Sequence, residues 1–194
     1  MVQNKSSLGV KSMSDQRKKL QKIVFVGMMA AVIFVLTMFV RIEIPTPTGY
    51  TNLKIANGFC LAAGMLFGGV WGGLAAGVGS MLFDVFDPKY IASAPFTFAF
   101  FFIMAFVCGV IANSGGKKGL NMPRNILAAF CGALSYWVLY ISKSVITLML
   151  AGSEFIPALA ATAPKMVTSG INGFTGVIVA CVIIRPLQKA LKIK

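Results

Sequence analysis

Five strong apolar segments and a sixth, weaker one dominate this chain of 194 residues. About 20 consecutive apolar residues are enough for one helix to cross the hydrocarbon core of a bilayer. Hydrophobic residues make up 57% of the sequence, charged residues 12%, and the mean hydropathy is +0.82, which does not suit a soluble domain. The sequence therefore predicts an all-α integral membrane protein with six transmembrane helices. We place these helices at residues 23–40, 53–67, 70–85, 94–112, 124–150 and 164–184.

The 18 basic residues are distributed unequally between the two ends of the predicted helices. All but five lie on the side that holds both termini; the exceptions are Arg41, Lys54, Lys89, Lys143 and Lys165. Lysine and arginine are enriched in cytoplasmic loops, so we expect both termini to face the cytoplasm. The same bias accounts for most of the net charge of +13. No basic stretch carries interleaved aromatic residues on a soluble scaffold, and we expect no nucleic-acid partner.

Residues 1–22 are polar and basic and are predicted to form a cytoplasmic tail, followed by a single six-helix membrane domain at 23–194. The tail and the first apolar segment together have the outline of a signal peptide. No A-x-A cleavage site follows them, so we expect a retained first helix. Between the first two predicted helices, Pro45 and Pro47 exclude a continuous helix. We predict that residues 41–52 form an ordered outer loop that acts as a lid.

The sequence lacks the residues of most catalytic centres. It contains no histidine, which excludes Ser-His and Cys-His nucleophile pairs and HExxH zinc sites. The four cysteines lie within apolar segments and form no C-x-x-C pair, and the few acids are widely spaced. The glycine- and lysine-rich segment at 114–119 lacks the spacing of an ATP-binding loop. We therefore expect no enzyme activity, no cofactor and no metal site.

Lysines inside two predicted helices are the most informative polar residues. A lysine within a membrane span is costly, by roughly 3 kcal/mol, and indicates a functional site. On each of the last two helices a lysine belongs to a polar stripe at helical spacing, which places its members on one face. The stripes are Tyr136, Tyr140, Lys143 and Thr147 on one helix, and Lys165, Ser169, Asn172 and Gly176 on the other. For Lys165, which is close to a helix end, snorkelling to the lipid headgroups is the alternative.

Other polar and aromatic residues are predicted to lie at the same depth, in the outer half of the membrane. Aromatic rings combined with two cations and a few amide or hydroxyl groups suit a small, planar, polar ligand. Location in the interfacial aromatic belt is the alternative for Tyr50 and Tyr90. The predicted substrate-binding residues are Tyr50, Asn52, Asn57, Asp84, Tyr90, Phe96, Tyr140, Lys143, Lys165, Ser169 and Asn172.

Three of these segments carry a resemblance to a known family. The run Tyr50-Thr-Asn52-Leu53, the turn Leu66-Phe67-Gly68-Gly69, and the glycine-rich segment that ends at Asp84 resemble the substrate-binding S component of energy-coupling factor (ECF) vitamin transporters, in particular its riboflavin-type subgroup. That family often has proline at the position of Gly69. Chain length, six spans and cytoplasmic termini also fit this family over nearly the whole sequence.

The resemblance implies a vitamin-binding subunit in the bacterial cell membrane, with its pocket beneath the loop between the first two helices. The implied partners are a membrane scaffold subunit and two cytoplasmic ATPase subunits. The family docks onto its scaffold through an Ala-x-x-x-Ala pattern in the first helix. The nearest match here is Gly27-x-x-x-Ala31, with Ala30 beside it. Packing inside the subunit is the alternative role for these small residues.

The substrate is not specified by the motifs. The small set of polar and aromatic residues favours pyridoxine or a hydroxymethylpyrimidine-like precursor, while riboflavin and cobalamin remain open. A stand-alone secondary transporter is the alternative of another class, and it is disfavoured because the sequence has no internal repeat. A membrane enzyme or assembly factor is disfavoured by the absence of histidine.

Overall fold

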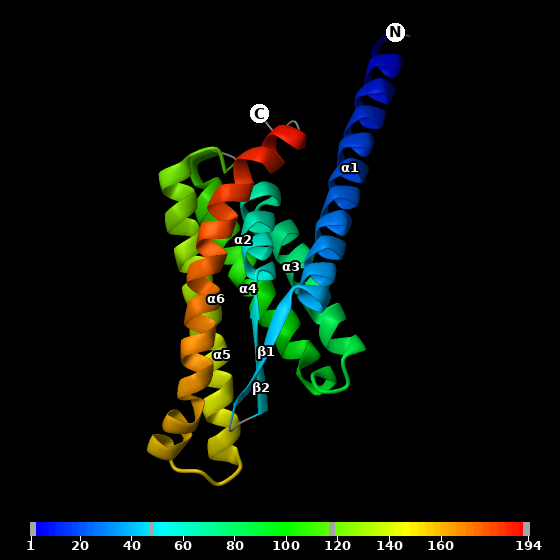
Figure 1. The fold of residues 1–194 in the computed structure, drawn as a ribbon. Helices are drawn as coiled ribbons and strands as arrows, with labels where there is room; N and C mark the ends of the chain where they lie inside the picture. Colours follow the sequence, from blue (N-terminus) through cyan, green and yellow to red (C-terminus); the bar gives the residue numbers. More distant parts are fainter. Residues whose placement is uncertain (1–2, 47–48, 117–118, 192–194) are drawn as a thin grey trace.

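The computed structural model describes residues 3–46, 49–116 and 119–191. Outside the described residues lie Pro47, which is part of the predicted lid, and Lys117 and Lys118, which are part of the glycine- and lysine-rich segment at 114–119. The elements in chain order are α1 (Gln3–Phe39), β1 (Arg41–Thr46), β2 (Gly49–Lys54), α2 (Ala56–Phe67), α3 (Gly69–Phe86), η1 (Ile91–Ser93), α4 (Ala94–Asn113), η2 (Ser114–Gly116), α5 (Met122–Leu150) and α6 (Phe155–Ala190). The start of α1 and the end of α6 lie at the same end of the bundle (Figure 1).

Within the residues that the structure describes, five helices are long and apolar enough to cross a membrane: α1, α3, α4, α5 and α6. The helix α2 has only 12 residues, or roughly 18 Å, which is too short for the roughly 30 Å of a bilayer core. The strand β2 precedes it directly and adds roughly 20 Å of extended chain. Strand and helix together are therefore long enough for one crossing, whereas the predicted count of six helical spans stays a prediction.

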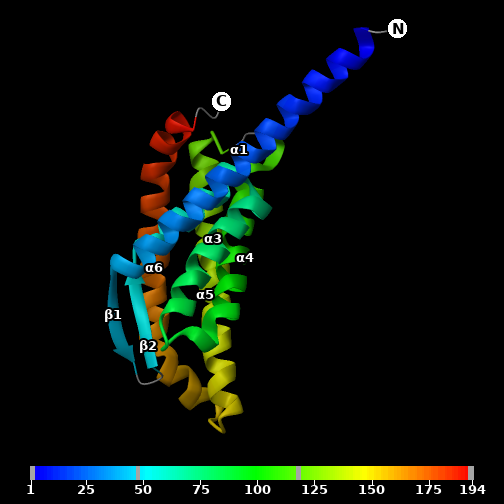
Figure 2. The same cartoon turned by 90° about the vertical axis from the view of Figure 1, so that its right-hand side faces the viewer.

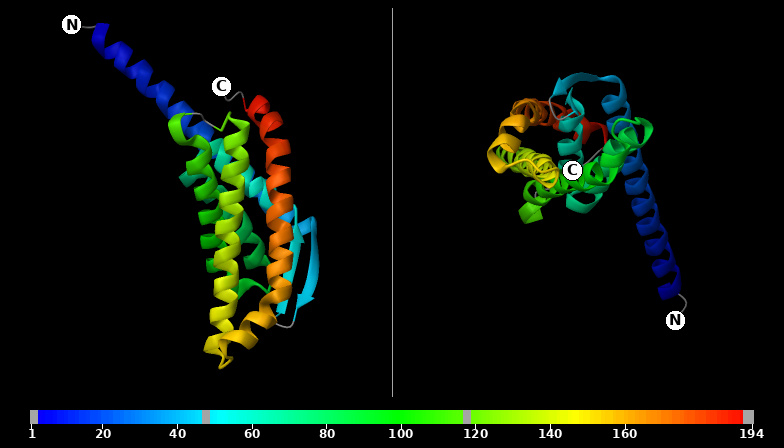
Figure 3. Two further views of the ribbon diagram at one scale, coloured as in Figure 1. Left: turned by 90° about the vertical axis from the view of Figure 1, so that its left-hand side faces the viewer. Right: turned by 90° about the horizontal axis from the view of Figure 1, so that it is seen from below.

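Residues 41–46 and 49–54 form the two strands of a β-hairpin, where the sequence predicted an ordered outer loop at 41–52. Strands β1 and β2 pair antiparallel, with Arg41 opposite Lys54 and Thr46 opposite Gly49. Pro45 is tolerated because β1 is an edge strand, where a missing backbone N–H breaks no ladder. The hairpin lies beside the half of the bundle that is remote from the chain termini (Figures 1 and 3).

Two helices begin many residues earlier than predicted. Helix α1 begins at Gln3, well before the predicted start at residue 23, and its basic first half projects away from the bundle (Figure 2). Helix α6 begins at Phe155, before the predicted start at Pro164, and continues through that proline. Because a proline inside a helix removes one backbone hydrogen bond, it favours a bend, and the first turns of α6 lie at an angle to the rest (Figure 1).

Glycines bring α2, α3 and α4 into close contact, because small residues let the backbones of neighbouring helices approach each other. A Cβ at Gly72 of α3 would lie 2.5 Å from the Cα of Gly64 on α2. A Cβ at Gly64 would lie 2.3 Å from the carbonyl oxygen of Ala105 on α4. These three helices form a buried core around Leu61 and Met104. Strand β2 and the segment between α3 and α4 are attached directly to this core at the end remote from the chain termini.

Candidate functional site

A cavity of about 360 Å³ lies between the hairpin and the bundle. Its walls are β2, the segment between α3 and α4, and the adjoining parts of α4, α5 and α6. A volume of this size is at the lower end of the range for pockets that enclose small organic ligands, roughly 300–1,000 Å³. The cavity is lined by charged, amide, hydroxyl and aromatic side chains together.

Asn172 of α6 joins the hairpin to the bundle. Its side-chain Nδ2 donates to the carbonyl oxygen of Asn52 at 2.6 Å, and its Oδ1 accepts from the backbone N–H of Lys54 at 2.9 Å. Both backbone groups are on the edge of β2 that β1 does not pair, so the amide acts as a third strand would. Tyr140 of α5 adds a contact of 3.4 Å between its hydroxyl and that of Thr51. The position of β2 over the cavity therefore depends on α5 and α6.

Stacked aromatic rings form one wall of the cavity. Tyr136 and Tyr140 lie one turn apart on α5, and their rings are nearly parallel, with centroids 5.7 Å apart and an interplanar angle of 8°. Phe101 of α4 packs against Tyr136 with a centroid distance of 4.7 Å. All three residues line the cavity. Flat aromatic surfaces of this kind favour a ligand with a planar ring.

Four lysines and one carboxylate line the cavity. The ammonium group of Lys54 lies 4.6 Å from the centroid of Phe101, and that of Lys143 lies 3.3 Å from the hydroxyl of Ser93. Asp84, which is 4% exposed, accepts a hydrogen bond from the hydroxyl of Thr97. The cavity is therefore rich in positive charge.

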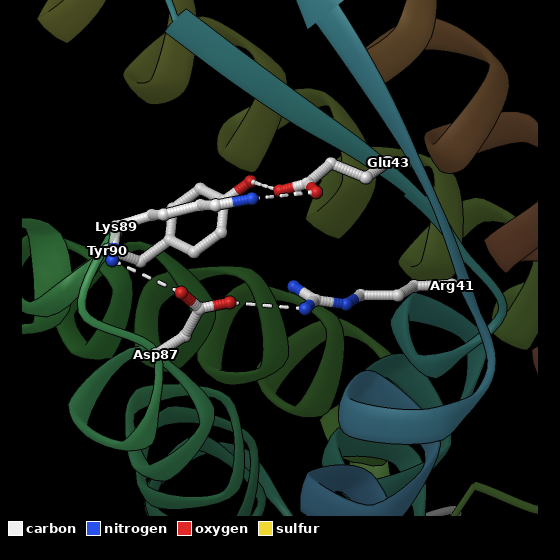
Figure 4. A network of polar contacts seen from close by, with 5 residues as sticks. All are labelled: Arg41, Glu43, Asp87, Lys89 and Tyr90. Carbon is white, nitrogen blue, oxygen red and sulfur yellow. Dashed lines mark hydrogen bonds and ion pairs between the residues drawn. The ribbon is translucent and has the colours of Figure 1, made fainter.

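Ion pairs fasten the hairpin to the segment between α3 and α4 at the rim of the cavity (Figure 4). Arg41 of β1 bonds Asp87 at 3.1 Å, and Glu43 accepts from Lys89 at 3.1 Å and from the hydroxyl of Tyr90 at 2.9 Å. The hydrogen bonds from Tyr90 and then Lys89 lower the pKa of Glu43, since they stabilise its ionised form. We call these five residues the rim cluster.

Comparison with protein families shows to which family the chain belongs. The family model of the ECF-type riboflavin transporter S component matches residues 17–189, which is most of the chain. The chain belongs to this family. It is thus an S component, the vitamin-binding subunit of a transporter, and a multi-pass membrane protein. The family is not an enzyme family, and its members work with a scaffold and ATPases.

One solved structure and two proteins of known sequence are similar to this chain. A solved S component of a bacterial ECF transporter superposes with a TM-score of 0.63 over 90% of this chain and 99% of that chain, at 23% identity, which shows the shared fold. An uncharacterized protein of Pyrococcus woesei is 34% identical over 58% of this chain and 70% of its own length. A UPF0397 protein of Lactiplantibacillus plantarum is 42% identical over 37% of each chain.

Ten of the eleven predicted substrate-binding residues of this S component line the cavity. These ten are Tyr50, Asn52, Asp84, Tyr90, Phe96, Tyr140, Lys143, Lys165, Ser169 and Asn172. The eleventh, Asn57, is buried on α2, where its Cβ faces Gly176 of α6 and not the cavity. We therefore leave Asn57 out of the proposed site. Binding of ligand by the other ten is a proposal, which their shared location supports.

Lys54 is the main residue that the prediction missed. It was expected in the first turn of a helix beginning at residue 53, but it ends β2, and its ammonium group lies against Phe101 inside the cavity. A signal was present, since Lys54 is one of the few basic residues on the basic-poor side. Phe101 and Thr97 were also missed as lining residues, because an almost continuous apolar helix does not reveal which face is inward.

The predicted docking residues divide between two faces of α1. Gly27 and Ala31 are exposed, and a Cβ at Gly27 would meet no atom within 4 Å. Ala30 is buried against α3, where a Cβ added at Gly79 would lie 2.5 Å from the carbonyl oxygen of Ala30. The exposed pair is thus open to a partner helix, whereas Ala30 packs inside the subunit.

Proposed function

We propose that this S component binds a heteroaromatic vitamin or vitamin precursor in the cavity beneath the hairpin, entering from the outer side of the membrane. One observation carries the proposal: stacked rings, amide groups and lysines from four separate elements line one cavity at the end of the bundle remote from the termini. The positive-inside distribution of basic residues supports the outer location of that end.

The size of the cavity bears on the substrate. About 360 Å³ accommodates a single or fused ring with short substituents, and a corrin with its attached nucleotide is too large. Pyridoxine or a hydroxymethylpyrimidine-like precursor is the ligand that the small polar and aromatic lining favours. Riboflavin is the second candidate, because the family model that matches is that of riboflavin transporters.

We propose that the hairpin is the lid of the site. It is fastened on one side by Asn172 and on the other by the rim cluster, so a ligand enters when one of these attachments opens. Loops or hairpins that close over a ligand exclude water and slow its release. A thiol placed at Thr46, the last residue of β1, should therefore react more slowly with a polar maleimide once ligand is bound. Unchanged reactivity at saturation would argue against a lid.

Delivery requires partners, and we propose a scaffold subunit bound at Gly27 and Ala31 together with two ATPases. The test is uptake into proteoliposomes that contain the chain alone or the chain with a scaffold and two ATPases. ATP-dependent uptake of pyridoxine, hydroxymethylpyrimidine or riboflavin only in the complete assembly is expected. Equal uptake by the chain alone, driven by an ion gradient, would instead show the secondary transporter.

A further inference from the structure

We propose that the basic first half of α1, residues 3–22, lies along the membrane surface and binds the headgroups of anionic lipids. The segment is at the end of the bundle where the start of α1 and the end of α6 lie, opposite to the cavity (Figure 1). This role goes beyond the proposed function and is separate from the binding of a vitamin.

Helix α1 is longer than one membrane crossing requires. It has 37 residues, or roughly 55 Å, whereas the hydrocarbon core of a bilayer is roughly 30 Å thick. The candidate membrane span within it is Lys19–Phe39. The first half of the helix therefore lies outside the hydrocarbon, and it projects to one side of the bundle (Figures 2 and 3). Because most helical stability in proteins comes from packing, we expect a surface other than the bundle to cover this half.

A contact between α1 and α3 marks the level of the membrane surface. The ammonium group of Lys22 lies 5.4 Å from the centroid of the Trp71 ring, in the first turn of α3. Tryptophan is enriched at the membrane–water interface, and a lysine at the same level reaches the headgroups. Trp71 is 37% exposed and Ile23 is 51% exposed, so lipid can contact both side chains. The residues before Lys22 are thus at the level of the headgroups or beyond it.

The charge of the segment indicates which surface covers it. Residues 3–22 contain six basic residues and a single acid, Asp15. Among the basic residues, Arg17, Lys19 and Lys22 are exposed. Basic clusters directly beside a membrane span attract anionic headgroups, and each basic residue near the surface contributes about fivefold in affinity. Lysine is depleted in the interfaces between proteins, so an anionic lipid surface fits this composition better than a partner protein does.

Amide hydrogen exchange of the full chain in lipid nanodiscs tests the inference. One set of nanodiscs contains phosphatidylcholine alone, and the other contains a mixture of phosphatidylcholine and phosphatidylglycerol. Exchange in residues 3–16 should be about 100-fold slower in the anionic nanodiscs, and the difference should vanish at about 1 M salt, where the Debye length is only about 3 Å. R17Q/K19Q should reduce this protection about 30-fold, the effect of two charges. Glutamine is nearly as good a helix former as lysine and arginine, so these substitutions change the charge and not the helix.

A charge-matched control is R185Q/K189Q, which removes two positive charges from exposed residues of α6 at the same end of the bundle. It should leave exchange in residues 3–16 unchanged in both kinds of nanodisc. Equal exchange in the two kinds of nanodisc, or equal loss of protection in the control and in R17Q/K19Q, would overturn the inference. Protection that arises only after a scaffold and ATPases are added would also overturn it and would assign the segment to a partner protein. Protection that depends on two chains sharing one nanodisc would assign it to a second copy.

Discussion

Asn172 is the residue whose replacement should most clearly uncouple the hairpin from the bundle. The side chain is 5% exposed, and both of its polar atoms bond the backbone of β2, at 2.6 and 2.9 Å. Asn172→Ala removes both bonds and leaves the carbonyl of Asn52 and the N–H of Lys54 without these partners. Each such bond contributes about 0.5–1.5 kcal/mol net, and a buried group left unsatisfied costs about 1–3 kcal/mol. Because water from the cavity replaces part of this loss, we expect about 1–3 kcal/mol in total.

Two measurements follow from this magnitude. Ligand affinity should fall about 5- to 150-fold in Asn172→Ala, and amide hydrogen exchange in β2 should accelerate by a similar factor, since the strand loses its second edge partner. Asn172→Asp is the matched variant. It keeps the acceptor for the N–H of Lys54 but loses the donor to Asn52, so exchange at Lys54 should stay closer to that of the unmodified chain. A folded Asn172→Ala protein with unchanged affinity and unchanged exchange in β2 would refute the role of this side chain.

Two further predictions concern the rim cluster and the first helix. Glu43→Gln should speed ligand release only a few-fold, because exposed ion pairs contribute about 0–1 kcal/mol. Since the pKa of Glu43 lies below its ordinary value of 4.5, its contacts with Lys89 and Tyr90 persist from neutral pH down to that value and are lost only in more acidic solution. Stopped-flow release that accelerates already between pH 7 and 5 would contradict this. Gly27→Leu with Ala31→Leu should abolish ATP-dependent uptake and spare ligand binding, because both residues face outward. Ala30→Leu is the contrasting variant and should lower thermal stability, since Ala30 packs against α3; loss of binding in the outward pair would assign that face to internal packing.

Helical spacing made most of the site predictable. Lys143 and Tyr140 on α5, and Ser169 and Asn172 on α6, line the same cavity because residues three, four and seven apart share a helix face. Polarity inside apolar segments then indicates a candidate functional face without knowledge of the packing.

The hairpin was not predictable in the same way. Its strands are short, the alternation of Ile42, Glu43 and Ile44 is brief, and Pro45 is a residue that usually argues against a strand. The strand β2 also depends on Asn172, which lies 118 positions after Lys54 in the chain, and such a partner is invisible in local sequence. Asn57 lies outside the cavity lining for a related reason, since its polarity was evident but the face of α2 that it occupies is set by packing against α6.

The most direct test of the account is quantitative mass spectrometry of the small molecules released by denaturing the purified chain. We predict one heteroaromatic vitamin or precursor at close to one molecule per chain. We also predict a marked loss of that molecule in Asn172→Ala protein purified in parallel, because the hairpin that covers the cavity is no longer held by α6. Release of an aliphatic or non-aromatic ligand, or equal retention by both proteins, would contradict the assignment of this cavity.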